Sequence, residues 1–463
     1  MSEEMKTLRK QLLRDSRSGY DVLEEAQLRR MEDYCADYKA FLGNKTERLS
    51  ARAAIAAAEA HGFVEYRRGM ALEAGDKVYT CNRSKSLMLA VMGRESMAEG
   101  VQIAAAHIDS PRLDLKPNPL YEDSELAYFK THYYGGIRKY QWVTIPLQLQ
   151  GVVVKKDGTA VEVCIGEKGE PQLVITDLLP HLGGEQGKKP LSEAIPAETL
   201  NILLGSRPIG DEDDSDRVKL HVMKRLYDKY GITEADFASA ELEAVPAADA
   251  VDIGIDGSMI GSYGHDDRVC GYAALHALLE LDAPAKTAVC VLADKEEIGS
   301  MGVTGMQSAV FETFLSDLCD SQNVPLKVCF ENSFCLSADV TAAYDPNFAD
   351  VFDKKNAAFL NHGVGLCKYT GARGKSGSSD AGAETVAYVR SLLDGAGVRW
   401  QICELGKVDA GGGGTVAQYM ANRNIATLDA GVPVLSMHAP FEVVAKLDCY
   451  EMYRACKAIY EAR

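Results

Sequence analysis

Residues 101–109 read VQIAAAHID, an almost unbroken apolar run that ends in a histidine and an aspartate. The run over 101–106 is too continuous for a strand that has one face in water. Such a run is typical of a central strand that is covered on both faces. The sequence therefore predicts a buried strand here, with His107 and Asp109 at its carboxyl end.

Strand-like and helix-like segments alternate on both sides of this run. Apolar side chains at helical spacing, or in short continuous runs, distinguish the two types. Strands are expected at 87–92, 101–106, 287–293, 333–338, 399–404 and 425–429, and helices at 22–42, 50–60, 267–281, 380–394, 415–422 and 447–462. This alternation predicts an α/β fold with a mixed, largely parallel sheet flanked by helices.

The middle of the chain has a different sequence pattern. Residues 151–166 read GVVVKKDGTAVEVCIG, in which Asp157-Gly158 joins two β-rich runs, and this pattern is typical of a hairpin. Polar, glycine-bearing segments follow it. We predict that 1–112 and 256–463 form one discontinuous catalytic α/β domain, and that 113–255 form a β-rich insert.

Composition narrows the class of protein. The 463 residues are 46% hydrophobic and 25% charged, and the net charge of −17 repels phosphate backbones and anionic lipids. The 12 cysteines form no CxxC pair, the charged N-terminus lacks the apolar segment of a secretory signal, and no apolar stretch approaches the ~20 residues of a membrane span. We therefore expect a cytoplasmic protein with reduced thiols and with no nucleic-acid or membrane partner.

Histidines and acids gather in five short motifs, four of which follow strand-like runs. The motifs are AAAHIDSPRLD (104–114), GHDDRVCG (264–271), ADKEEIGSMG (293–302), SADVTAAYDPN (337–347) and VLSMHAPFE (434–442). Each motif alone has an ordinary structural explanation, such as a helix cap, a turn or a loop contact. Because open α/β sheets place their sites beyond the carboxyl ends of the strands, we expect the motifs to meet there. Together they supply the nitrogen and oxygen donors that zinc prefers.

Two of these motifs contain adjacent acids. Helix capping explains one of Asp266 and Asp267 but not the second, and a carboxylate at this place could bridge two divalent cations. Glu296 and Glu297 follow an apolar run, so a metal could hold one and leave the other as a general base. A serine hydrolase is disfavoured because the chain has no GxSxG motif.

Taken in order, HIDSP, DDR after Gly-His, DxEEIGS and SMHAPFE resemble the aspartyl aminopeptidase family of dinuclear zinc exopeptidases. The resemblance covers essentially the whole chain. It implies a zinc-exopeptidase-like fold and a metallo-aminopeptidase that hydrolyses the N-terminal residue of peptides. The family uses a water that bridges two Zn²⁺ ions, with Co²⁺ or Mn²⁺ as substitutes.

The resemblance also implies a role for each motif residue. Asp266 matches the bridging carboxylate, Glu296 the general base and Asp109 the partner of the first histidine. The remaining metal ligands would be His107 and Asp339 for one zinc and Glu297 and His438 for the other.

Two further residues are carried over on shorter matches. Lys368, in GLCKYTG, falls where the family has a lysine that reaches the substrate, and His181, in DLLPHLGG, is the candidate for a histidine that a neighbouring subunit contributes. The family also implies dimers, formed through the insert, that assemble into a dodecamer.

The chain departs from the family pattern at two positions. Where many members read D-x-x-H-A-x-H-P-N, Ala342 and Asp345 replace the two histidines. A preference for N-terminal Asp or Glu therefore depends on the rest of the site. Two alternatives stay open: a related two-zinc carboxypeptidase or deacylase, and a catalytically silent, shell-forming protein of the same fold.

Overall fold

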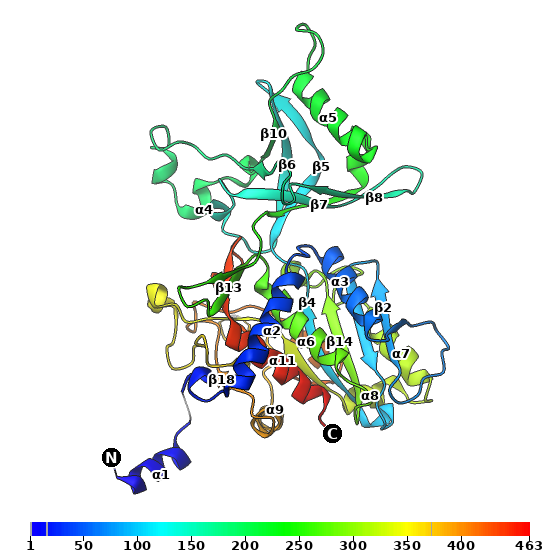
Figure 1. Cartoon of the computed structure of the whole chain (residues 1–463), viewed down its shortest axis with the longest axis vertical. Helices are drawn as coiled ribbons and strands as arrows, with labels where there is room; N and C mark the ends of the chain where they lie inside the picture. Colours follow the sequence, from blue (N-terminus) through cyan, green and yellow to red (C-terminus); the bar gives the residue numbers. More distant parts are fainter. Residues whose placement is uncertain (1, 15–16, 372) are drawn as a thin grey trace.

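A nine-stranded sheet forms the centre of the larger lobe in the computed structural model, which describes residues 2–14, 17–371 and 373–463 (Figure 1). Most of the neighbouring strands are parallel, as predicted. In spatial order the strands are β1 (Val64–Glu65), β2 (Lys77–Asn82), β3 (Ser86–Val91), β14 (Thr287–Ala293), β4 (Val101–His107), β15 (Phe334–Ala338), β19 (Ala426–Gly431), β17 (Val364–Cys367) and β18 (Trp400–Ile402). We call this part the α/β lobe.

The predicted central strand is β4. It lies between two parallel neighbours, β14 and β15, and all of its residues are buried. Its side chains alternate between two cores, because Ala104 and Ala106 face one layer of helices while Ile103 and Ala105 face the other. The continuous apolar run therefore reflects burial on both faces.

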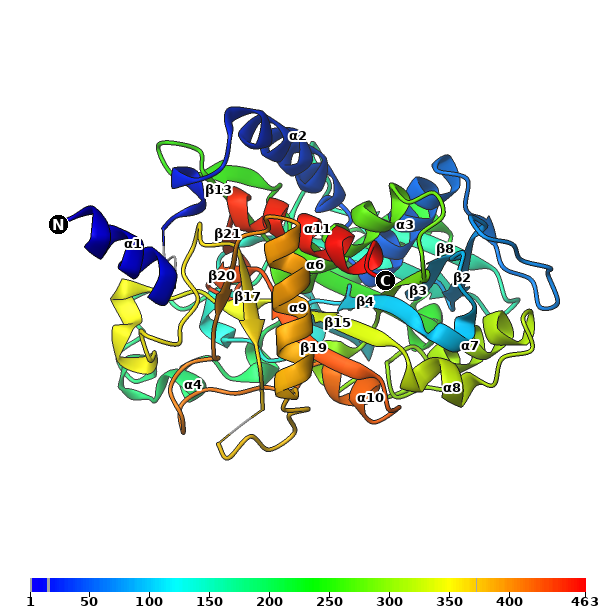
Figure 2. The ribbon, with the colours of Figure 1, turned by 90° about the horizontal axis from the view of Figure 1, so that it is seen from below.

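Helices cover both faces of this sheet (Figure 2). The first layer contains α2 (Glu25–Phe41), α3 (Glu47–Ala60), α6 (His265–Leu279), α9 (Ala383–Gly395) and α11 (Lys446–Tyr460). The second layer contains α7 (Val310–Asp320), α8 (Leu326–Glu331) and α10 (Ala417–Ala421). The short helix α1 (Glu3–Leu12) projects from the lobe and has no buried residue.

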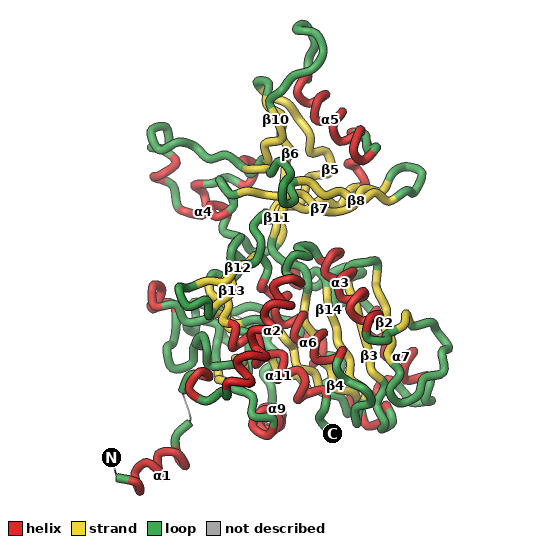
Figure 3. Tube along the Cα trace, in the orientation of Figure 1, coloured by secondary structure: helices red, strands yellow, loops and turns green. Residues whose placement is uncertain are grey.

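A second sheet forms the other lobe, which we call the insert lobe (Figure 3). Its strands are β5 (Arg112–Asp123), β6 (Leu126–Tyr134), β7 (Pro146–Val154), β8 (Ala160–Ile165), β9 (Leu173–Val174), β10 (Ile202–Gly205) and β11 (Ala240–Pro246). β11 pairs with both β5 and β7, so the sheet closes on itself around its own apolar core. β7 and β8 form the hairpin that Asp157-Gly158 predicts, and two helices, α4 (Leu191–Ala194) and α5 (Arg217–Tyr230), complete the lobe.

A smaller five-stranded sheet brings three of the sequence motifs together. Its strands, in spatial order, are β12 (Val251–Ile253), β13 (Met259–Ser262), β21 (Glu442–Ala445), β20 (Pro433–Leu435) and β16 (Thr341–Ala342). These strands flank Asp266, Asp339 and His438 in the sequence. None of the helices in the described part of the chain combines the length and the hydropathy that a membrane crossing requires.

Candidate metal centre

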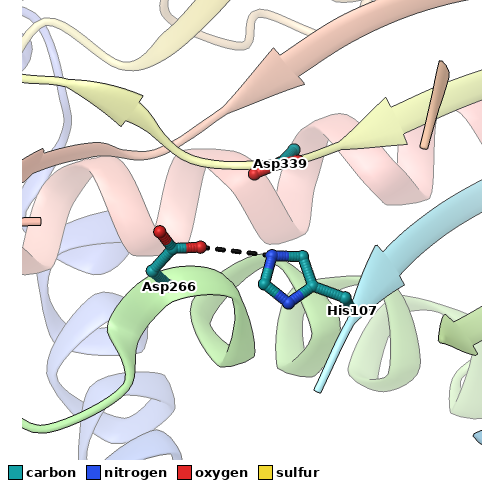
Figure 4. A group of neighbouring side chains, drawn as sticks. All are labelled: His107, Asp266 and Asp339. Carbon is teal, nitrogen blue, oxygen red and sulfur yellow. Dashed lines mark ion pairs between the residues drawn. The ribbon is translucent and has the colours of Figure 1, made fainter. Parts of the chain in front are cut away.

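Two groups of metal-ligand side chains meet at one edge of the large sheet. The first contains His107, Asp266 and Asp339 (Figure 4), and the second contains Asp266, Glu297 and His438. Within each group the ligand atoms lie within 4.8 Å of one another. The structure thus brings together all five residues that the family resemblance implies as ligands.

The topology of the sheet explains this convergence. His107 ends β4, Asp339 directly follows β15, and Glu297 lies in the turn η7 (Glu296–Ile298) after β14. These three strands are parallel neighbours, so their carboxyl ends lie at the same edge. Asp266, at the start of α6, and His438, between β20 and β21, complete the group.

Asp266 faces both histidines. Its Oδ1 lies 3.2 Å from His107 Nε2, and its Oδ2 lies 3.1 Å from His438 Nε2. Burial acts to raise the pKa of Asp266, but its hydrogen bonds to His107 and His438 outweigh burial and lower it. The carboxylate therefore stays ionised and offers one oxygen to each side, as a ligand shared between two cations would.

The two adjacent glutamates approach different histidines. Glu296 Oε2 is 3.8 Å from His107 Nε2, whereas Glu297 Oε2 is 3.5 Å from His438 Nε2. Burial and nearby acids raise the pKa of Glu296 to about 7, and burial with the charge of Asp266 raises the pKa of Glu297 well above its usual range. The site therefore holds more carboxyl groups than its two histidines could neutralise if all of these groups were ionised.

The residues fit divalent metal ions. Glu297 Oε1 is buried and has no hydrogen-bond partner among the residues that the structure describes. Leaving such an oxygen unsatisfied costs roughly 1–3 kcal/mol or more. A cation would satisfy this oxygen, offset the excess of carboxylates, and find the nitrogen and oxygen donors typical of zinc sites.

Asp109 connects the first histidine to both glutamates. His107 Nδ1 lies 2.9 Å from the Asp109 carbonyl oxygen and 3.3 Å from its Oδ1. The Asp109 carboxylate also accepts hydrogen bonds from the backbone N–H groups of Glu296 (3.1 Å) and Glu297 (3.2 Å). Burial acts to raise the pKa of Asp109, but the contact with His107 lowers it. Asp109 thus lies where a carboxylate can fix the orientation of a ligand histidine.

Sequence reasoning assigned no role to three residues that contact this site. Glu442, quoted only as part of a motif, accepts hydrogen bonds from the backbone N–H groups of His438 (2.7 Å) and Asp266 (3.1 Å), and burial raises its pKa to about 8. Tyr134 and Gly136 reach the site from the insert lobe. The position of Glu442, four residues after His438, is a sequence signal that could have pointed to its role at the site. Nothing in the sequence around Tyr134 or Gly136 indicates their contacts.

The residues carried over on shorter matches lie outside the two ligand groups. Lys368 directly follows β17, and its Nζ lies 3.4 Å from Asp380 Oδ1, which Lys375 also contacts at 3.0 Å. His181 is exposed in the loop between β9 and η4 (Gln186–Lys188) of the insert lobe. Their roles toward a substrate or a neighbouring subunit therefore stay predictions.

Comparison with known proteins identifies the family of this chain. The family described as Aminopeptidase I zinc metalloprotease (M18) matches residues 44–460. A probable M18 family aminopeptidase 1 of Clostridium acetobutylicum is 48% identical over 450 residues, which are 95% of this chain and 97% of the relative. A similar relative in Thermotoga maritima is 44% identical over 438 residues, 93% of this chain and 96% of its own.

Solved structures show the same fold. The crystal structure of the M18 aminopeptidase of Thermotoga maritima superposes with a TM-score of 0.93 at 41% identity, and covers 97% of this chain and 99% of its own. The Saccharomyces cerevisiae mApe1 dodecamer gives a TM-score of 0.75 at 21% identity over 93% of this chain and 99% of its own, which shows a shared fold. The named relatives favour an aminopeptidase over a carboxypeptidase, a deacylase or a silent shell protein. This chain belongs to the M18 aminopeptidase I family of zinc metalloproteases and is a zinc aminopeptidase.

Proposed function

We propose that this aminopeptidase works with two divalent metal ions that share Asp266, and with Glu296 as its general base. The observation that carries the proposal is the position of Asp266, whose two oxygens face two histidines from different elements. His107 and Asp339 would complete one site, and Glu297 and His438 the other. Each ligand group has one nitrogen donor and two carboxylates, which leaves positions for water and substrate.

The reaction follows from this arrangement. Zinc ions, when bound, would polarise the scissile carbonyl and make a water more acidic. Glu296 points toward His107 but lies outside both ligand groups among the described residues, so its carboxylate is available for proton transfer. It would accept the proton of the attacking water and then donate a proton to the leaving amine. Asp109 would keep His107 and the backbone of both glutamates in place.

We infer a preference for N-terminal Asp and Glu, with Lys368 as the cation that recognises the acidic side chain. A chain with a net charge of −17 repels acidic substrates at long range, so such a preference needs a local positive charge. The Lys368 side chain is 44% exposed and pairs with Asp380, so an acidic substrate would compete with Asp380 for the ammonium group.

Lys368→Met should lower kcat/KM for Asp- and Glu-initiated peptides only. Losing one charge-assisted contact costs about 1.5–3 kcal/mol, which is roughly a 10- to 150-fold loss. The measurement compares Asp-, Glu-, Leu- and Ala-initiated peptides, with Lys375→Met as the matched control because Lys375 contacts the same Asp380 oxygen. Equal losses for all four peptides, or a wild type that prefers Leu, would refute the acidic preference and leave the aminopeptidase activity standing.

We also propose that residues 113–255 act as a dimerisation domain and that dimers assemble into a dodecamer. Support comes from the mApe1 dodecamer, which has this fold, and from exposed leucines around His181. Leu178, Leu179 and Leu182 are 47%, 48% and 68% exposed. Clustered exposed apolar side chains are typical of an interface, and this one would carry His181 to a neighbouring subunit.

A charge placed in this leucine cluster should break the assembly. Leu182→Glu would bury an unpaired charge at the interface, so the mass measured by light scattering should fall to that of a smaller species. Leu220→Glu is the control, because Leu220 lies on α5 of the same lobe and is 54% exposed. An unchanged mass for Leu182→Glu would place the interface elsewhere.

The state of the cysteines indicates the compartment in which the enzyme acts. All 12 cysteines are free in the structure, and ten of them are buried. Free thiols in this number are typical of a reducing compartment. The cytoplasm is therefore the location that we propose, with peptides as substrates.

A further inference from the structure

The insert lobe contacts the metal centre at the end of strand β6. Tyr134 is the last residue of β6, and its hydroxyl donates a hydrogen bond of 2.8 Å to Asp109 Oδ2. Two residues later, the carbonyl oxygen of Gly136 lies 2.9 Å from His438 Nδ1. Residues 134–136 thus contact Asp109, the partner of His107, and also contact His438 directly.

We propose that residues 134–136 form a positioning segment, through which the insert lobe sets the orientation of His107 and His438. The inference rests on the proposed two-metal function and adds to it a role for the insert lobe within the chain. The α/β lobe alone would then hold an incomplete metal centre, because the hydrogen-bond partners of its ligands come partly from the insert.

Tyr134 acts on the first histidine through Asp109. The tyrosine side chain is buried, and its hydroxyl is one of four groups around the Asp109 carboxylate. The other three are the His107 ring and the backbone N–H groups of Glu296 and Glu297. Without the hydroxyl, the carboxylate would lose one of its fixed partners and hold the His107 ring less firmly.

The ring of Tyr134 is itself held rigidly. The Arg112 guanidinium lies 3.9 Å from the centre of the ring, and Arg112 is only 5% exposed. Arg112 is paired with Asp114 at 2.8 Å and with Glu47 and Glu243 at 3.3 Å each. Glu47 belongs to α3 of the α/β lobe, whereas the other two acids belong to strands of the insert lobe. Tyr134 is therefore fixed at the junction of the two lobes.

The glycine part of the segment acts on the second site. The Gly136 carbonyl accepts the Nδ1 proton of His438, which leaves Nε2, 3.1 Å from Asp266, as the ring nitrogen that would bind a metal ion. Gly135 has a φ of +75°, and a Cβ atom there would lie 3.2 Å from Glu297 Oε2 and 3.3 Å from Glu297 Cβ. Only glycine lets the backbone pass this close to Glu297 without strain.

Tyr134→Phe tests the segment, because it keeps the ring and its contact with Arg112 and removes only the hydroxyl. Loss of a direct partner of a ligand histidine typically costs 10- to 100-fold in metal affinity, and Tyr134 acts one step further out, on that partner. We therefore expect a loss of about 10-fold, at the lower end of this range, for one of two Co²⁺ ions when the metal-free protein is titrated and the visible Co²⁺ spectrum is followed, with a smaller effect on the second ion. Tyr133→Phe, at the exposed neighbouring position, should titrate like the wild type.

Gly135→Ala provides the complementary result. The Cβ atom of the new alanine would press on Glu297, so this substitution should weaken the binding of the ion that Tyr134→Phe affects less. Circular dichroism and thermal unfolding establish that Tyr134→Phe is folded. Wild-type affinities in Tyr134→Phe, or an equal loss at both ions, would overturn the inference. A wild-type protein that binds no Co²⁺ would instead refute the two-metal function, and that result appears before any substitution is made.

Discussion

Replacing Glu296 by glutamine should lower kcat by about 10²- to 10⁴-fold without changing the zinc content. Glutamine has nearly the same shape as glutamate, so the packing around the site should persist, but its amide cannot accept the proton of the attacking water. The Glu296 carboxylate lies beside His107 and outside both ligand groups, so its loss should spare the metal. Steady-state kinetics and elemental analysis of the same preparation check both parts.

Glu297→Gln is the matched control for this experiment. The two glutamates are adjacent and both side chains approach a histidine of the site, yet only Glu297 belongs to a ligand group. The control should therefore lose metal affinity as well as activity. If Glu296→Gln keeps the wild-type kcat, or if it loses metal as Glu297→Gln does, Glu296 is not the general base.

Asp266→Ala should weaken the binding of both metal ions, whereas Asp339→Asn should weaken only one. The reason is geometric: Asp266 belongs to both ligand groups, and Asp339 belongs to the His107 group alone. Loss of a group that only hydrogen-bonds a metal ligand already lowers metal affinity by 10- to 100-fold. Loss of a shared ligand should therefore lower the affinity for each ion by more than about 100-fold. Competition with a metal-chelating dye measures the two affinities separately.

The outcome for Asp266 also discriminates between one shared centre and two independent sites. In a shared centre, Asp266→Ala leaves neither ion at its wild-type affinity and peptidase activity disappears with them. If Asp266→Ala retains one ion at the wild-type affinity, the carboxylate serves a single metal and the two-metal mechanism is wrong.

The large sheet could be predicted because its strands are buried on both faces. β4 and β14 are uninterrupted apolar runs, and runs of this kind have few alternatives to a central strand. Parallel neighbours end at a common edge, so His107, Glu297 and Asp339 could be expected to meet. They do so although Glu297 lies 190 positions and Asp339 lies 232 positions after His107 in the sequence. The convergence of the motifs thus follows from topology.

The acid pair at the start of α6 shows where a local explanation falls short. Helix capping accounts for one acid by a contact with its own helix, but the two carboxylate oxygens of Asp266 face His107 and His438 instead. Asp267 accepts a hydrogen bond from the backbone N–H of His107 at 3.3 Å, so it ties the end of β4 to the start of the helix. The sequence could not reveal this contact, because it joins residues 160 positions apart.

The contribution of the insert lobe to the site was beyond sequence reasoning for the same reason. The contact between Gly136 and His438 spans 302 positions and uses a backbone carbonyl, which leaves no mark in residue type. The hydroxyl of Tyr134 looks like that of any strand tyrosine until the fold places it on Asp109. Motif patterns identify ligands, whereas the groups that orient them depend on how the lobes are joined.

The metal content of the wild-type enzyme tests the central claim most directly. Protein purified without chelator, analysed for zinc, cobalt and manganese against its chain concentration, should contain two ions per chain. Removal of the ions by a chelator should abolish peptidase activity, and return of Zn²⁺ should restore it. A single ion per chain in the active enzyme, or no metal above background, would contradict the account.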